Sequence, residues 1–245
     1  MGTLYAGTSG WAYTSWRRGF YPKKLPAAEF LNYYSTRLNS VEVNYSFLHP
    51  LITEVVAGWI AATPPDFKLA VKAPQFITHM KRLRGVKQPL KKFLSSLGPI
   101  ADANKLGPIL FQLPPNFKCN PDLLQEFLAG LPPEPRSAFE FRHVSWFADE
   151  VFELLRESGV ALCQAESEKL ETPHIQTADF SYLRLRKDHY SPGSRRNLIG
   201  RVKDTMTRGD VFVYFKHEKT PEGALHAEDL LASISGPSRN GTGSL

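Results

Sequence analysis

Short apolar runs, rich in branched and aromatic residues, recur along the chain and are bounded by polar, proline or glycine residues. Runs of this length and composition are typical of β-strands. The pattern predicts strands at about residues 4–7, 40–43, 67–71, 108–113, 137–141, 161–164, 181–185 and 211–215.

Between most of these runs, apolar residues recur three or four positions apart, which predicts helices with one buried face. The positions are Phe30, Leu31, Tyr34 and Leu38; Val55, Val56, Trp59 and Ile60; Leu90, Phe93, Leu94 and Leu97; Leu123, Leu124, Phe127 and Leu128; Val151, Phe152 and Leu155; and Ala227, Leu230, Leu231 and Ile234. Alternating strands and helices indicate parallel strands joined by right-handed crossovers. Eight such units predict an α/β fold, a single closed TIM-type (β/α)8 barrel, with an open doubly wound sheet as the alternative.

The length of 245 residues, with 42% hydrophobic and 22% charged residues, fits a soluble globular chain. Barrels of this type commonly use about 250 residues as one domain. With no internal repeat and no linker, we expect one barrel domain over residues 1–235, acting as a monomer. The last ten residues, GPSRNGTGSL, predict a flexible tail over 236–245.

The net charge and the cysteine content indicate which ligands the protein binds and in which cellular compartment it works. Thirty Lys and Arg against 24 Asp and Glu give a net charge of +6, which favours anionic ligands or weak nucleic-acid binding. Cys119 and Cys163 show neither metal-ligand nor redox spacing, and no apolar run approaches the roughly 20 residues that cross a bilayer. We therefore expect a cytoplasmic protein with no membrane partner.

The predicted strand ends are unusually polar, and catalytic groups of such barrels cluster there. Glu42 and Asn44 share one face of their strand, because side chains alternate with a period of two. The other strand-end residues are Lys72, Gln112, Glu140, Arg142, His143 and Arg184. If the alternate apolar residues pack against helices, these polar side chains point into the barrel.

Two interpretations of this cluster remain open. It is either an ion-pair network that closes the barrel or a functional site; burying many charges is costly, which favours a site. Glu42 and Glu140 against Lys72, Arg142 and Arg184 sum to −2 + 3 = +1. Such a pocket should bind an anion, with Trp11 and Tyr13 among its aromatic walls.

Candidate catalytic groups are the carboxylates Glu42 and Glu140, which could act as general acid and base, together with His79. The alternative for His79 is a loop hydrogen-bond partner. Glu42, His79, Glu140 and His143 could be combined into a metal site, but they lie on separate segments without a compact ligand motif, so we expect no metal. Dinucleotide and phosphate-loop fingerprints are absent, and no cofactor is expected.

Several blocks of sequence resemble the YecE-like family, also called domain of unknown function 72. In order they are GTSGWAYTSW, SVEVNYSF, FKLAVKAPQFITHMKRL, LGPILFQLPPNF, EFRHVSWF, YLRLR and VYF, and the resemblance covers roughly residues 3 to 232. It implies a TIM-type barrel with an interior polar cluster, and no established activity. The chain departs from the family pattern at Leu48-His49, Arg186-Lys187 and Lys216-His217, which makes the rim more basic.

Two functions from different classes follow. The first is an enzyme, a hydrolase or lyase, acting on an anionic, phosphate-bearing small molecule, with Lys72, Arg142 and Arg184 as charge clamps and Asn44 and Gln112 as orienting groups. The second is a non-catalytic barrel that binds a nucleic-acid fragment or an acidic partner through a basic rim that includes Arg82, Arg84 and Lys187.

Overall fold

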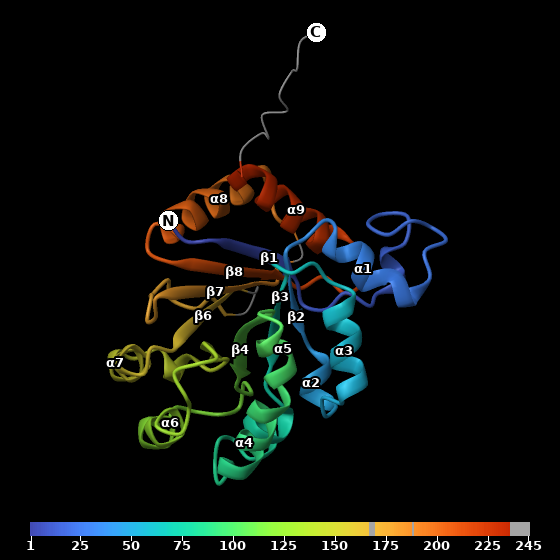
Figure 1. Ribbon diagram of the computed structural model, residues 1–245. Helices are drawn as coiled ribbons and strands as arrows, with labels where there is room; N and C mark the ends of the chain where they lie inside the picture. The colour runs from blue at the N-terminus through green and yellow to red at the C-terminus, as the bar shows by residue number, and fades with distance from the viewer. Residues whose placement is uncertain (167–169, 188, 236–245) are drawn as a thin grey trace.

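Eight parallel strands form a nearly closed barrel surrounded by helices in the computed structural model, which describes residues 1–166, 170–187 and 189–235 (Figure 1). The predicted fold class is therefore confirmed, and the open doubly wound alternative is wrong. The predicted tail over 236–245 lies outside the described residues.

The strands follow one another around the barrel in the order β1-β8-β7-β6-β5-β4-β3-β2. Each hydrogen-bonded pair is parallel, so all carboxyl ends meet at one mouth. The bounds are β1 Leu4–Thr8, β2 Ser40–Val43, β3 Lys68–Lys72, β4 Leu106–Gln112, β5 Ser137–Glu140, β6 Ala161–Glu166, β7 Phe180–Leu185 and β8 Asp210–Phe215. All eight predicted strands are present, and their ends agree with the prediction to within two residues.

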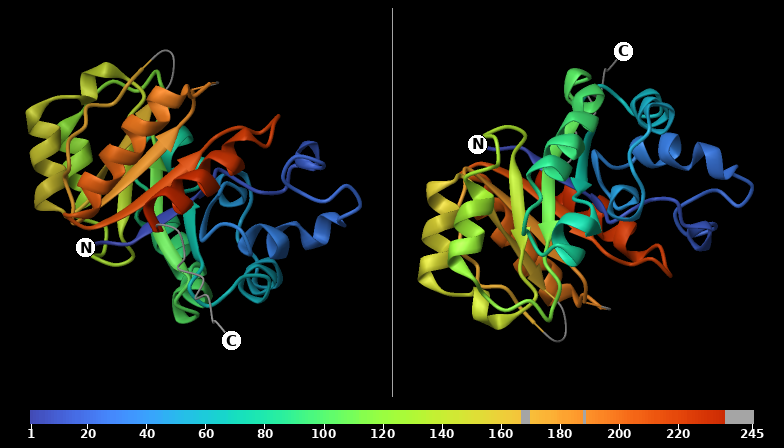
Figure 2. Two further views of the ribbon diagram at one scale, coloured as in Figure 1. Left: turned by 90° about the horizontal axis from the view of Figure 1, so that it is seen from above. Right: turned by 90° about the horizontal axis from the view of Figure 1, so that it is seen from below.

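The helices lie outside the strands, as the views from above and below show (Figure 2). Their bounds are α1 Phe30–Ser35, α2 Tyr45–Leu48, α3 Thr53–Ala61, α4 Lys87–Ser96, α5 Gly98–Asp102, α6 Pro121–Leu128, α7 Asp149–Glu157, α8 Pro192–Met206 and α9 Glu222–Ser235, with short turns η1 Thr14–Trp16, η2 Ala27–Glu29, η3 Phe76–Met80 and η4 Val144–Trp146. The segment between β1 and α1, dark blue in Figure 2, projects beyond the ring of helices.

Helix α8 is the longest of the helices that the pattern of apolar residues failed to predict, the others being the short helices α2 and α5. Its sequence is mostly polar and basic, and its buried positions include Leu198, Val202, Thr205 and Met206. A Ser191 cap, which accepts a hydrogen bond from the Ser194 amide, and Pro192 in the first turn define where the helix begins. The strand-to-helix alternation fails once, because residues 170–179 between β6 and β7 contain no helix.

Two layers of side chains fill the molecule. Outward-facing apolar residues of the strands, such as Val71, Phe111 and Val213, pack against the helices. A separate inner cluster fills the barrel itself with Ala70, Leu110, Ala138, Ala161, Cys163, Phe180, Tyr182, Phe212 and Tyr214. Residues of this inner face recur with a period of two, so on β3, β4, β5, β7 and β8 the next inward position is a polar residue near the mouth; on β6 it is Ala165.

The barrel closes between β1 and β2 by side chains instead of a regular ladder. Asn39 accepts from the Ala6 amide at 2.8 Å and donates to the Leu4 carbonyl at 2.8 Å. The Tyr34 hydroxyl bridges the Thr8 amide at 2.8 Å and the Ser40 carbonyl at 3.0 Å. One backbone bridge, Ser9 to Glu42, completes this seam.

Candidate functional site

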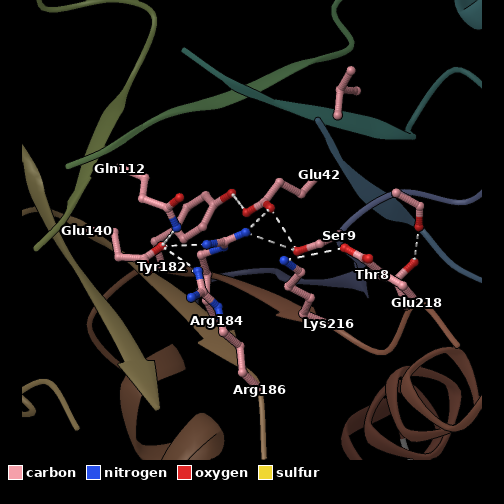
Figure 3. A network of polar contacts seen from close by, with 12 residues as sticks. Thr8, Ser9, Glu42, Gln112, Glu140, Tyr182, Arg184, Arg186, Lys216 and Glu218 are labelled. Atoms are coloured by element: carbon pink, nitrogen blue, oxygen red, sulfur yellow. Dashed lines mark hydrogen bonds and ion pairs between the residues drawn. The ribbon is translucent and has the colours of Figure 1, made fainter. Parts of the chain in front are cut away.

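Three charged side chains from three strands meet inside the barrel mouth (Figure 3). Arg184 at the end of β7 contacts Glu42 of β2 at 2.6 Å and Glu140 of β5 at 2.5 Å. All three side chains are at most 2% exposed. The sequence prediction that these residues point inward is therefore confirmed by their geometry, which joins them into one buried ion-pair network.

Neutral donors complete the hydrogen bonding of Glu42. Ser9 donates to its Oε1 atom at 2.8 Å, and the Tyr182 hydroxyl donates to Oε2 at 2.8 Å. Burial raises the pKa of Tyr182 well above its ordinary value, and the charge of Glu42 adds to the effect. Tyr182 therefore stays protonated and serves as a permanent hydrogen-bond donor to this carboxylate.

Glu140 takes its hydrogen bonds from three side chains. Gln112 donates to Oε2 at 2.8 Å, beside Arg184. Arg186 contacts Oε1 at 2.7 Å and Oε2 at 2.9 Å. We define Glu42, Glu140, Arg184 and Arg186 as the charge-balanced cluster, because its two carboxylates face two guanidinium groups.

Arg186, and not Arg142, fills the second cationic position of this cluster. Arg186 continues the direction of β7, since its amide donates to the Glu166 carbonyl at 3.2 Å. On β5, by contrast, the chain turns after Glu140: Trp146 stacks on Phe141 with ring centroids 4.6 Å apart. That turn leaves the Arg142 side chain exposed, outside the cluster.

Electrostatics hold Arg184 charged in spite of its burial. Burial acts to lower the pKa of its guanidinium, but Glu42 and Glu140 outweigh that effect and the pKa lies above its ordinary value. A charge this deep remains stable because it is paired on both sides. The cluster is therefore a fixed, neutral assembly at the base of the mouth.

Lys72, at the end of β3, differs from the cluster because no carboxylate of the described residues pairs with its ammonium. It is 8% exposed, and its ammonium lies 3.8 Å from the centroid of the Phe47 ring. No hydrogen bond or ion pair reaches this ammonium from the residues that the structure describes. Burial and the nearby Arg184 charge lower the pKa of Lys72 to about 8, against the opposing influence of Glu42 and Glu140.

His79 lies in η3, beyond β3, and belongs to the same part of the mouth as Lys72. Its ring meets the Phe47 ring edge to face at 5.0 Å, and its Nδ1 pairs with the Thr78 hydroxyl at 2.9 Å. Burial, followed by the charges of Lys72 and Arg142, lowers the pKa of His79. His79 is therefore a hydrogen-bond partner within its loop, as one of the two predictions had it, and its ring also lies near the charged residues of the mouth.

The remaining predicted residues lie around the rim. Asn44 stands half-buried between β2 and α2, and His143 pairs with the Ser145 hydroxyl at 2.8 Å. Tyr13 donates to the Ser9 carbonyl at 2.8 Å, and Trp11 packs edge to face on Trp59 at 5.8 Å. Tyr13 therefore reaches the cluster only through Ser9.

Sequence reasoning missed Ser9 and Tyr182 as site residues and treated Arg186 as part of the rim. A period-two signal for two of them was present: Tyr182, Arg184 and Arg186 alternate along one face of β7. Ser9 carried no comparable signal, because it follows β1 in a glycine-rich turn.

Two further findings concern the described residues as a whole. Over residues 1–166, 170–187 and 189–235, no three His, Cys, Asp or Glu side chains gather into a group that could hold a metal ion. Within the same residues, every helix is too short or too polar to cross a bilayer.

A parallel eight-stranded barrel with a buried ionic cluster at its carboxyl-terminal mouth defines the class of this protein. The chain belongs to the family described as "Protein of unknown function DUF72", whose model matches residues 5–241. The resemblance noted in the sequence is thereby confirmed.

Named relatives and solved structures agree with this membership. The chain is 29% identical to UPF0759 protein YunF of Bacillus subtilis over 61% of its own length and 54% of the relative's. It is 30% identical to UPF0759 protein YecE of Escherichia coli (strain K12) over 59% of its length and 50% of the relative's. The matches thus span about half the length of these relatives.

A crystal structure of a DUF72 family protein from Thermotoga maritima is 26% identical, with a TM-score of 0.86, covering 96% of this chain and 100% of the other. A DUF72 family protein from Enterococcus faecalis shares the fold, with a TM-score of 0.73 at 18% identity, over 94% and 98% of the two chains.

Proposed function

We propose that this protein is an enzyme, a hydrolase or lyase, acting on an anionic, phosphate-bearing small molecule at the mouth of the barrel. The observation that carries this proposal is the unpaired ammonium of Lys72 above a cluster whose own charges already cancel. A buried positive charge without a partner is costly, and a bound anion would supply the missing partner.

Other cations extend this positive region outward. Arg142 is exposed at the rim, and Lys216, beyond β8, is opposed by Glu218 at 3.3 Å. Arg186 has 14% of its side chain exposed, which makes it the cluster arginine that solvent reaches. Its planar guanidinium suits the oxygens of a phosphate.

Binding of phosphate to Arg186 would also change the hydrogen bonding of Glu140. Arg186 is the partner of the Glu140 Oε1 atom, while Oε2 also receives Gln112 and Arg184. An anion that draws Arg186 away frees one oxygen of Glu140. In this proposal Glu140 then acts as the acid or base, and the more enclosed Glu42 holds Arg184 in place.

Calorimetric titration with phosphate, sulfate and a neutral sugar tests anion recognition. We expect phosphate and sulfate to bind at millimolar concentration and the sugar to give no heat. Lys72→Met should weaken phosphate binding about tenfold or more, and Arg142→Ala should weaken it less. Lys68→Met is the matched control, because Lys68 lies on the same strand at the opposite end of the barrel. Unchanged binding by Lys72→Met would overturn the proposal.

A second candidate, nucleic-acid binding at the rim, draws support from the loop after β3. Lys81, Arg84 and Lys87 are exposed, and among the described residues none of them forms an ion pair. Binding of an oligonucleotide that falls steeply with salt and is weakened by Arg84→Ala, with Lys72→Met unchanged, would favour this function over the first.

A further inference from the structure

Lys72 combines three features that a charge clamp alone does not need. Its stem is enclosed, its nitrogen rests on an aromatic ring 3.8 Å away, and no carboxylate of the described residues pairs with it. The two nearest carboxylates, Glu42 and Glu140, are already bound by Arg184. The strand end thus presents an amine that is directed at the mouth and that forms no hydrogen bond with the part of the chain that the structure describes.

The surroundings of Lys72 favour the neutral, nucleophilic amine. Burial is the leading cause of its lowered pKa of about 8, and the positive charges of Arg184 and Lys216 act in the same direction. His79 adds a neighbouring titratable ring. At pH 7 a larger fraction of Lys72 side chains is then uncharged than of surface lysines. Desolvated lysines near other cations are the ones that react with carbonyl groups.

We propose that Lys72 is a catalytic nucleophile that forms an imine with the carbonyl carbon of a phosphate-bearing aldehyde or ketone. This proposal rests on the proposed function and narrows its substrate class. The phosphate would lie close to Lys72 and also contact the outward cations, and the carbonyl of the same small molecule would meet the uncharged form of the amine above the Phe47 ring.

The step balances without any oxidant or cofactor. The Lys72 nitrogen donates its electron pair to the carbonyl carbon, and the π pair of the C=O bond moves to oxygen; the nitrogen loses one proton and the oxygen gains one, which gives the carbinolamine. The oxygen then takes up a second proton and leaves as water, while the nitrogen loses its second proton and its electron pair forms the carbon–nitrogen double bond. His79 or solvent exchanges the protons.

An imine on Lys72 would favour a lyase over a hydrolase. Once protonated, it accepts the electron pair released when a bond next to the carbonyl carbon breaks. That chemistry cleaves carbon–carbon or carbon–hydrogen bonds and has no use in simple phosphate-ester hydrolysis. Lyase activity is therefore the expected member of the hydrolase-or-lyase pair.

Borohydride trapping tests this proposal on the full-length protein. Glycolaldehyde phosphate is added at pH 7 with sodium borohydride, which reduces the imine to a stable secondary amine, and peptide mass spectrometry locates the adduct. We expect Lys72 to be labelled about tenfold faster than any other lysine, including Lys68, whose ammonium is bound to the Asn104 carbonyl at 2.6 Å. Labelling spread evenly over surface lysines, or absent from Lys72, would overturn the proposal.

Two further measurements separate this proposal from the one on which it rests. Glycolaldehyde, which lacks the phosphate, should label Lys72 about tenfold more slowly than its phosphate ester; equal rates would keep the imine and reject phosphate recognition. Phosphate binding by calorimetry without any Lys72 adduct would keep the anion site and reject the imine. Because trapping is mapped on the unmodified chain, the result does not depend on whether Lys72→Met folds.

Discussion

Each end of the barrel buries one lysine, and the two ammonium groups have different partners. Lys105, just before β4, is 6% exposed and donates to the Ile60 carbonyl at 2.7 Å, the Thr63 carbonyl at 2.6 Å and the Thr63 hydroxyl at 3.1 Å. Lys72, at the carboxyl end of β3, has comparable burial but an aromatic ring as its neighbour.

The difference separates a structural charge from a reactive one. Carbonyls at the end of α3 accept hydrogen bonds from the Lys105 ammonium, although burial lowers the pKa of this lysine too. Lys72 receives no hydrogen bond of this kind from the described residues, and the Phe47 ring together with the charges of Glu42 and Glu140 offsets only part of the cost of burying its charge. Burial alone therefore does not distinguish the two ends; the partners do.

The largest effect is expected at Arg184, which pairs two carboxylates at once. Arg184→Met leaves Glu42 and Glu140 buried with fewer opposing charges, and we expect a loss of about 3–5 kcal/mol in the free energy of unfolding. Urea denaturation measures it. The exposed pair Arg195–Asp229, 3.5 Å apart, supplies the control, since Arg195→Met should cost under about 1 kcal/mol. Equal losses would mean that the cluster does not stabilise the barrel.

The next effect is expected at Lys105. Lys105→Met removes the donor from two backbone carbonyls, and we expect a loss of about 2–3 kcal/mol because these acceptors are left without their charged partner. Denaturation at neutral pH checks the value. A loss near zero would show that the Lys105 charge does not stabilise the fold, and the proposed difference between the two lysines would be wrong.

Lys72→Met should do the opposite and stabilise the protein at pH 7, by about 1–2 kcal/mol. Methionine is unbranched and only one atom shorter, removes the desolvated charge and brings its thioether towards the Phe47 ring. Destabilisation by this substitution would show that the ammonium has a structural role.

The pH dependence of that gain sharpens the comparison. Folding lowers the pKa of Lys72 from 10.5 to about 8, so between these values the unfolded chain binds more protons than the native protein. Stability contributed at this site therefore rises with pH; the penalty is complete below about pH 8 and disappears towards pH 10.5. The advantage of Lys72→Met over wild type should shrink across that window, and an advantage constant from pH 7 to about pH 10 would contradict the lowered pKa.

The smallest effect on stability belongs to Arg142. Because its side chain is exposed, Arg142→Ala should change the free energy of unfolding by no more than about 0.5 kcal/mol. It should nevertheless reduce phosphate affinity a few-fold at low salt. A stability loss comparable to that of Arg184→Met would place Arg142 in the cluster after all.

The fold could be predicted because barrel strands leave a local signal. Each strand is a short apolar run, and that pattern depends little on distant contacts. Helix α8 was not predicted because its few apolar residues are separated by charged and polar ones. Its buried face can be identified only from the packing of β8 and α9 against it.

The site was predictable where the strand period holds and not where the chain turns. Period two placed Glu42, Glu140 and Arg184 on inward faces, and they meet there. The same rule applied to Arg142 misses the turn at Phe141, which depends on Trp146 packing five residues later. Ion pairs across the barrel, such as Arg186 with Glu140, join strands far apart in sequence and follow from strand order, which no local pattern contains.

The seam between β1 and β2 makes the barrel unequal around its circumference. A Cβ atom on Gly7 would lie 1.8 Å from the Ser40 carbonyl oxygen, so the two strands approach too closely there for any side chain. Since Asn39 and Tyr34 replace ladder bonds along this line, the Ala6 and Thr8 amides depend on two side chains for protection from solvent exchange. Local opening would begin at this seam, and the same motion separates Ser9 from Glu42. Deuterium uptake at these two amides would thus report how often the site comes apart while the rest of the barrel stays folded.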